Sequence, residues 1–251
     1  MDVFKADGGY GAWMRRTMRP FPRLRTLRAA VGGDFEAMGA MQLAILRHYG
    51  LRPESSVIDA GCGVGRLAHA LEGWLTGPYL GTETNRTFLR AARRSVRAAN
   101  FRFARVKGLT IPAPDRSADF ACFFSVFTHL LHEQTYLYLE EAKRVLAPGG
   151  RIVFSFLEFG SEAAWPAFAA TVEHARNGIP RTLNVFVERT AIATWAAHLG
   201  LDVVDIRDAA EPFAPLDAPI AFESGAVQSG LGCLGQSVAV LAAASSPKGT
   251  S

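Results

Sequence analysis

The chain has 251 residues, of which 49% are hydrophobic and 20% charged, a composition typical of a globular protein that can bury a large core. The formal net charge is +4, and no apolar run reaches the roughly 18 residues that a membrane helix needs, so we expect no membrane association. Three widely spaced cysteines, Cys62, Cys122 and Cys233, form no C-x-x-C pair. This spacing indicates neither a disulfide framework nor a zinc site, and it predicts a cytosolic protein without a bound metal.

The excess of positive charge lies in the first thirty residues, which we interpret as a basic arm with one short helix around Tyr10 to Met18. Its cationic residues are Lys5, Arg15, Arg16, Arg19, Arg23, Arg25 and Arg28. They suit either a polyanion or acidic substrate, or simple solvation. We favour solvation, because few aromatic residues accompany them for stacking on bases.

Asp34 is placed to cap a helix that runs to about Tyr49 and ends at Gly50. Helical spacing puts four side chains on one face: Met38, Met41, Ile45 and His48. This face is expected either to pack on the sheet edge or to cover a ligand site.

The segment Ser56–Leu71 organises the rest of the chain. Val57–Ala60 reads as a buried strand, Gly61, Gly63 and Gly65 break it, and helical spacing resumes from Arg66 to Thr76. Strand, glycine turn and helix together form a geometry that binds nucleotide cofactors. The dinucleotide fingerprint needs a third glycine where this chain has Arg66, which argues against NAD or FAD.

The run Asp59-Ala60-Gly61-Cys62-Gly63-Val64-Gly65 resembles motif I of the class I S-adenosylmethionine-dependent methyltransferases. The resemblance implies a doubly wound α/β fold and S-adenosyl-L-methionine as cofactor, with S-adenosyl-L-homocysteine as product. It also implies cofactor contacts from the first five residues of the run: Asp59, Ala60, Gly61, Cys62 and Gly63.

A second strand, Tyr79–Thr82, ends at Glu83, about 20 residues past the glycine turn. A carboxylate at this place can accept hydrogen bonds from both ribose hydroxyls. The run Gly81-Thr82-Glu83-Thr84-Asn85 resembles the family pattern G-x-D-x-(S/N), so Glu83 and Thr84 join the expected cofactor site. The alternative is a surface glutamate at a strand end.

Asn85 can cap a third helix, whose arginines at 86, 90, 93, 94 and 97 we interpret as a solvated face. Phe101–Val106 alternates as a strand, and Gly108 to Asp119 follows as a proline-containing loop. The family often carries an adenine-binding Asp where this chain has Lys107. We therefore expect the backbone of Gly108 and Leu109 to contact adenine.

Asp119–Val126 is an apolar run short enough for a central strand buried on both faces. It would carry Phe124 and Ser125 to the cofactor and His129 to the carboxyl edge of the sheet, where open α/β sheets bind ligands. His129 is our candidate catalytic residue. It could act as a general base, orient an acceptor, or only hydrogen-bond a backbone group.

A helix from His132 ends at Ala147-Pro148-Gly149-Gly150, a turn that resembles the family's RVLKPGGR segment and leads into a fifth strand, Arg151–Phe156. Ser161 to Asn177 predicts an inserted helix before the break at Gly178-Ile179-Pro180 and the segment Arg181 to Val187. A helix at Glu188–Leu199, a strand at Leu201–Arg207, a long loop at Asp208–Gly235 and a last strand at Gln236–Leu241 complete the prediction.

These patterns predict one α/β methyltransferase domain: a Rossmann-like doubly wound sheet of seven strands with the last antiparallel, an N-terminal helical cap and an insertion after the fifth strand. Its expected parts are an arm and cap (1–49), a cofactor-binding core (50–157), the insertion (158–187) and the end of the sheet (188–251). We expect methyl transfer to a small-molecule O-, N- or C-nucleophile, with no nucleic-acid partner. The alternatives are an RNA methyltransferase that uses the basic arm, and a cofactor-binding protein without turnover. The sequence leaves the oligomeric state open.

Overall fold

The computed structural model describes residues 27–28, 32–178 and 183–244. The predicted helix at Tyr10 to Met18 and most of the basic arm lie outside these ranges. Among the described residues, no helix combines the length and apolar character needed to cross a membrane.

The core is a sheet in the order β3-β2-β1-β4-β5-β12-β7, with β6 paired to β5. The strands on this path are β3 (Phe101–Arg105), β2 (Tyr79–Glu83), β1 (Val57–Ala60), β4 (Ala118–Phe123), β5 (Leu146–Glu158), β12 (Ser237–Ala243) and β7 (Leu201–Arg207). The short β6 spans Phe186–Val187. Strands β3 to β5 are parallel, whereas β12 is antiparallel to both neighbours. The predicted Rossmann-like fold with an antiparallel last strand is therefore confirmed.

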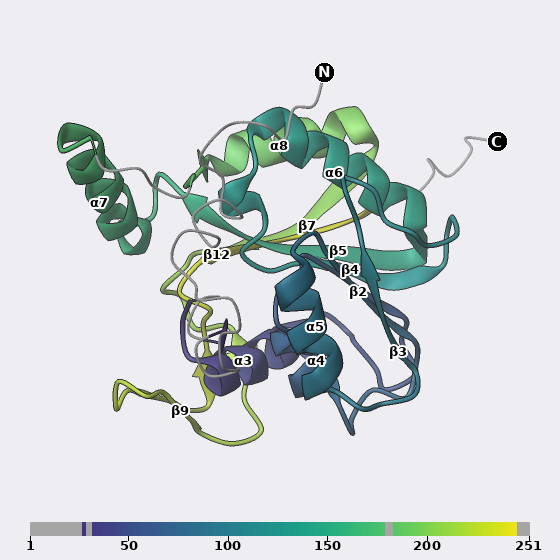
Figure 1. The fold of residues 1–251 in the computed structure, drawn as a ribbon. Coiled ribbons are helices and arrows are strands. Elements are labelled where there is room, and N and C mark those ends of the chain that lie inside the picture. Colours follow the sequence, from purple (N-terminus) through teal and green to yellow (C-terminus); the bar gives the residue numbers. More distant parts are fainter. Residues whose placement is uncertain (1–26, 29–31, 179–182, 245–251) are drawn as a thin grey trace.

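Helices cover both faces of the sheet (Figure 1). One face carries α3 (Phe35–His48), α4 (Arg66–Leu71) and α5 (Arg86–Ser95), and the other carries α6 (His132–Val145) and α8 (Arg189–Leu199). Alternate residues of a strand point to opposite faces, so Val57 of β1 joins the core beneath α3 and Ile58 joins the core beneath α6. The two cores hold the carboxyl ends of the parallel strands in fixed register.

The turn after α4 differs from the sequence prediction. The helix ends at Leu71 rather than Thr76, because Gly73 adopts a positive φ of 81° and the N–H groups of Thr76 and Gly77 donate to the carbonyl of Pro53. The competing hydrogen bonds to Pro53 thus stop the helix a turn early.

We expected His48 to share the buried face of α3. Instead, His48 lies in the last turn of the helix and is exposed. Its ring packs edge-on against Tyr49 and Phe213, at centroid distances of 4.8 and 5.8 Å. The predicted N-cap is confirmed, because the Asp34 carboxylate accepts a hydrogen bond from the Ala37 N–H.

The long loop predicted after β7 contains two short pairs of antiparallel strands. They are β8 (Ala214–Pro215) with β11 (Leu231–Gly232), and β9 (Ile220–Ala221) with β10 (Val227–Gln228). This segment is tied to α3: Glu223 N–H donates to Asp34, and Arg47 forms an ion pair with Asp217. It contributes Phe213, Ala214 and Leu234 to the core beneath α3, which explains why it is ordered.

The insertion between β5 and β6 contains η3 (Glu162–Ala164) and α7 (Trp165–Arg176). In Figure 1, α7 extends away from the sheet, and none of its residues is buried.

A buried carboxylate joins three elements at the end of β5. Glu158 is only 3% exposed, accepts a hydrogen bond from the Ser237 hydroxyl of β12 (2.8 Å), and forms an ion pair with Arg189, the first residue of α8. The second Arg189 contact, from Nη2 to Oε2, is 2.9 Å long. Burying a carboxylate is costly without such partners.

We expect Arg189→Ala to lower the free energy of unfolding by about 1–3 kcal/mol, because it removes the cation that compensates Glu158; the exposure of Arg189 keeps the loss below that of a fully buried pair. Urea unfolding measures this loss. The matched control is Arg90→Ala on the exposed face of α5, for which we expect a change within about 0.5 kcal/mol. Equal stabilities of the two variants would contradict a stabilising role for the pair.

Candidate functional site

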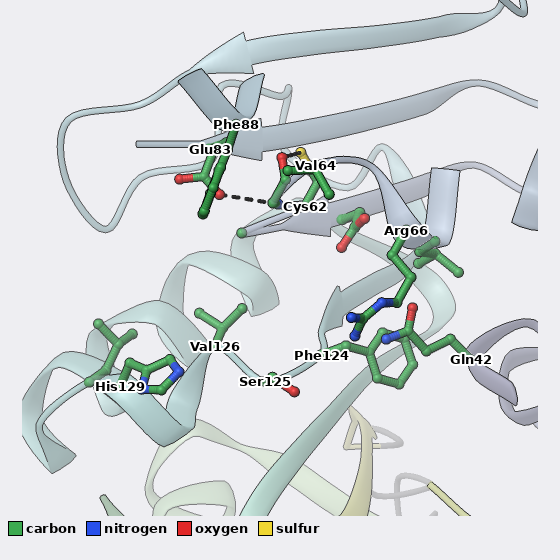
Figure 2. Close-up of a pocket in the computed structure, with 15 residues that line it drawn as sticks. Gln42, Cys62, Val64, Arg66, Glu83, Phe88, Phe124, Ser125, Val126 and His129 are labelled. Carbon is green, nitrogen blue, oxygen red and sulfur yellow. Dashed lines mark hydrogen bonds between the residues drawn. The ribbon is translucent and has the colours of Figure 1, made fainter. Parts of the chain in front are cut away.

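A cavity of about 270 Å³ lies at the carboxyl edge of the parallel strands. Its lining comes from α3, β1, the glycine turn, α4, the end of β2, α5 and the segment after β4. The residues are Gln42, Asp59, Gly61, Cys62, Gly63, Val64, Arg66, Leu67, Glu83, Phe88, Phe124, Ser125, Val126, His129 and Leu130 (Figure 2).

The glycine turn passes very close to the segment that follows β4. Gly61 has a φ of +73°, and a Cβ at this position would lie 2.6 Å from Cγ2 of Val126. Gly63 has a φ of +56°. Because side chains disfavour both the dihedral and the close approach, the turn requires a glycine at 61.

Asp59 is the penultimate residue of β1 and is only 3% exposed, and the Tyr79 hydroxyl donates to its carboxylate at 2.6 Å. Burial raises the pKa of Asp59 to about 7; the Tyr79 hydrogen bond and the charge of Arg66 act in the opposite direction. Asp59 therefore holds a proton far more readily than an exposed aspartate does.

Glu83 at the end of β2 is bonded to the glycine turn. Its Oε2 accepts from the Gly63 N–H (3.1 Å), and its Oε1 accepts from the Asn85 N–H (2.7 Å) and the Thr84 hydroxyl (3.2 Å). Burial raises the pKa of Glu83, and these hydrogen bonds oppose the rise. The carboxylate is thus held in one orientation at the cavity wall, beside Phe88 (Figure 2).

Ser125 adopts a φ of +58°, which ends β4 at Phe123 rather than at Val126 as expected. Its N–H donates to the Ser155 hydroxyl of β5 (2.8 Å), and both hydroxyls donate to Oε1 of Gln236 (3.1 and 2.6 Å). Non-glycine residues with positive φ are strained and cluster at functional sites. The three strands β4, β5 and β12 therefore fix the chain where it enters the cavity wall.

His129 lies at the end of η2 (Phe127–His129) and lines the cavity. Its Nδ1 is 2.7 Å from the carbonyl oxygen of Leu183, so in the neutral ring Nδ1–H donates there and Nε2 carries the lone pair. Burial lowers the pKa of His129, and the Leu183 carbonyl opposes this effect.

The cavity brings together most of the residues expected from sequence: Asp59, Gly61, Cys62, Gly63, Glu83, Phe124, Ser125 and His129. Ala60, Thr84, Gly108 and Leu109 are not among its lining residues. Ala60 is fully buried in the sheet, and the Thr84 hydroxyl is bonded to Glu83. The described residues of the insertion and the 208–235 segment are not among the lining residues. The insertion reaches the site through the Leu183 carbonyl, which lies 2.7 Å from Nδ1 of His129.

Sequence reasoning missed the remaining lining residues, which are Gln42, Val64, Arg66, Leu67, Phe88, Val126 and Leu130. Gln42 had a signal: it lies four residues after Met38 and three before Ile45, so it is a polar residue on an apolar helix face. Val126 and Leu130 had none, because their placement depends on the backbone turn at Ser125.

Comparison with known proteins identifies one domain in the chain. Residues 58–154 match the family described as "Methyltransferase domain". This range starts in β1 and ends in β5, so it contains the glycine turn, Glu83 and the segment after β4. These residues form a methyltransferase domain.

Solved structures of other proteins share this fold over most of the chain. A methyltransferase-like chain from a complex with the Haloferax volcanii Trm112 methyltransferase activator matches with a TM-score of 0.62 and 16% identity, covering 96% of this chain and 100% of that one. Magnesium protoporphyrin IX methyltransferase from Synechocystis PCC 6803, with bound S-adenosylhomocysteine, matches with a TM-score of 0.59 and 13% identity, covering 92% of each chain. A SAM-dependent methyltransferase from Methanosarcina mazei matches with a TM-score of 0.56 and 15% identity, covering 80% of this chain and 98% of that one.

We expect the raised pKa of Asp59 to make the ligand-free methyltransferase less stable as pH rises. Between about pH 4 and 7 the unfolded Asp59 is ionised while the folded Asp59 keeps its proton, so unfolding releases a proton and the free energy of unfolding falls with pH. Asp59→Asn removes this contribution and can still accept the Tyr79 hydrogen bond. Urea unfolding at pH 5, 6, 7 and 8 should show that the free energy of unfolding of the variant increases relative to that of wild type up to about pH 7. A pH-independent difference would contradict the assignment.

Proposed function

We propose that the chain is a class I S-adenosylmethionine-dependent methyltransferase and transfers the methyl group of this cofactor to a small-molecule acceptor held between the glycine turn and His129. The observation that carries the proposal is the single cavity that joins the glycine turn and Glu83 to His129 and Leu130. A concave, mostly apolar site with a few convergent polar groups suits a small molecule. Incubation of a metabolite pool with the enzyme and methyl-labelled cofactor, followed by mass spectrometry, tests the proposal; label found only in RNA or protein would contradict it.

We assign cofactor binding to Asp59, Gly61, Cys62, Gly63, Glu83, Phe124 and Ser125. Three observations support the fit: a glycine turn too close to Val126 for a side chain, a carboxylate at Glu83 oriented by backbone N–H groups, and a buried Asp59 that no side-chain cation within the described residues contacts. A cationic ligand would stabilise ionised Asp59. Ala60, Thr84, Gly108 and Leu109 are left out because they do not line the cavity.

When bound, the sulfonium cofactor supplies an electrophilic methyl carbon. The chain's own residues then have to align the acceptor and exclude water rather than activate the methyl group. Glu83 would hold the ribose hydroxyls, Val126 and Leu130 would shield the reacting atoms, and Nε2 of His129 would take the proton from an acceptor hydroxyl. An acceptor that is already nucleophilic would need only orientation.

We expect Glu83→Ala to weaken binding of S-adenosylhomocysteine by about 10- to 100-fold, since each hydrogen bond to a charged group is worth about 1.5–3 kcal/mol. Calorimetric titration measures the loss. Glu54→Ala, an exposed carboxylate before β1, is the control and should bind as wild type. Unchanged affinity in Glu83→Ala would remove Glu83 from the cofactor site.

If His129 is the base, His129→Asn should lower kcat by about 10²–10⁴-fold while leaving cofactor affinity within a few-fold. Activity of the wild type should rise with pH through a histidine pKa below its usual value, because burial lowers it. A purely structural His129 predicts lower thermal stability with nearly unchanged activity per folded molecule. Measuring both on one variant separates the two roles.

A second candidate function, methylation of RNA, is favoured by one observation. Residues 84–107 contain eight basic side chains and no acidic one: Arg86, Arg90, Arg93, Arg94, Arg97, Arg102, Arg105 and Lys107. They lie on α5, on the edge strand β3 and in their flanks. Filter binding of RNA with a steep salt dependence that Arg90→Glu abolishes would support it. Salt-independent or absent binding would favour the small molecule.

A cytosolic location of the protein stays a prediction.

A further inference from the structure

Gln236, the residue directly before β12, accepts two serine hydroxyls with one side-chain oxygen. Its Oε1 accepts from Ser125 Oγ at 3.1 Å and from Ser155 Oγ at 2.6 Å. Ser155 is fully buried on β5, and its Oγ in turn accepts from the Ser125 N–H at 2.8 Å. Because a buried hydroxyl cannot donate to water, its hydrogen needs the Gln236 oxygen. Both polar hydrogens of Ser125 are therefore held by Gln236, one directly and one through Ser155.

These hydrogen bonds support a backbone conformation that serine disfavours. Ser125 has a φ of +58°, in the left-handed region where a Cβ comes too close to the following carbonyl oxygen. Such a conformation persists only where the surrounding structure imposes it. The shared acceptor at Gln236 and the buried hydroxyl of Ser155 supply that constraint.

The conformation of Ser125 decides where the next residues of the cavity wall lie. Val126 and His129 both line the cavity, and Figure 2 shows them following Ser125 along one side of it. The Ser125 carbonyl accepts from the Thr128 hydroxyl at 3.1 Å, and the Val126 carbonyl accepts from the His129 N–H at 3.0 Å. A different φ at Ser125 would therefore move Val126 away from Gly61 and move His129 with it.

We propose that Gln236 is a positioning residue for the cofactor cavity, which holds Ser125 in the left-handed conformation and thereby places the wall opposite the glycine turn. Gln236 is not among the lining residues, so it acts through Ser125, 111 positions earlier in the chain. The inference rests on the proposed function, because the ligand of this cavity is taken to be the methyl-donating cofactor.

The first experiment needs no ligand. The Cα and Cβ chemical shifts of Ser125 and its HN–Hα coupling depend on φ, and NMR measures them in the wild type and two variants. Gln236→Met keeps the side-chain length but removes the acceptor oxygen, so Ser125 should leave the left-handed conformation. Gln236→Glu keeps an acceptor oxygen and should retain it. An unchanged Ser125 in Gln236→Met would overturn the proposal.

The second experiment measures the affinity for S-adenosylhomocysteine by calorimetry. Gln236→Met should bind about tenfold more weakly, since two hydrogen bonds that support the wall are lost. Gln236→Glu should stay within about threefold of wild type, because its carboxylate can accept the same two bonds. Gln228→Met is the matched control and should bind as wild type. Gln228 is a half-buried glutamine whose Oε1 accepts from the Cys233 N–H at 2.7 Å, and it does not line the cavity.

A third experiment separates positioning from a general loss of packing. Glycine adopts a positive φ without a steric penalty, so Ser125→Gly no longer needs the constraint from Gln236. Adding Gln236→Met to Ser125→Gly should therefore weaken S-adenosylhomocysteine binding by no more than about twofold beyond Ser125→Gly alone. A purely structural Gln236 predicts the same loss of affinity and of melting temperature in both backgrounds, and that result would overturn the positioning role.

Failure of the cofactor assignment gives a different pattern. A wild-type protein that does not bind S-adenosylhomocysteine would contradict the assignment, while the φ of Ser125 in Gln236→Met still decides whether Gln236 positions this wall. Weaker binding in Glu83→Ala together with wild-type binding in Gln236→Met would overturn the role of Gln236 alone.

Discussion

The site depends on the close approach of two backbone segments, the glycine turn after β1 and the segment after β4. A Cβ at Gly61 would lie 2.6 Å from Val126, so the two segments meet without an intervening side chain. From this contact the turn continues to Cys62, whose N–H donates to the Thr82 carbonyl of β2 (2.9 Å), and to Gly63, whose N–H donates to Glu83. One constraint therefore places residues from β1, β2 and β4 around a common cavity.

The start of the segment after β4, at Ser125, is held by hydrogen bonds between polar groups. Ser125 is kept at a positive φ by hydrogen bonds to Ser155 and Gln236, which lie on β5 and directly before β12. Ser155 is fully buried, so its hydroxyl has few alternatives to these partners. The strain at Ser125 is thus borne by strands that never touch the cavity, which is how a rigid sheet can support an unfavourable backbone conformation at a site.

Much of the fold could be predicted, because its signals are local. The glycine spacing, the Asn85 cap and the Pro148-Gly149-Gly150 turn each determine backbone geometry within a few residues. The pocket residues at strand ends, such as Glu83 and His129, followed from the rule that parallel strands present their carboxyl ends at one edge. What the sequence could not predict depends on contacts between distant segments. The order in the 208–235 segment comes from its packing on α3, and the early end of α4 comes from the carbonyl of Pro53. The exclusion of Gly108 and Leu109 from the cavity lining was equally beyond a local pattern.

The position of β12 bears on how the protein is made. This strand lies between β5 and β7, and among the described strands β7 pairs with no other. Until residues 237–243 have left the ribosome, β5 and β7 both present open edges. Leu201 of β7 then has no neighbouring strand, and Phe154 of β5 has only β4 beside it. Open edges of this kind pair readily with other chains. The sheet is therefore completed only after synthesis of β12, so the nascent chain has to be kept from aggregating from the synthesis of β5 until that of β12.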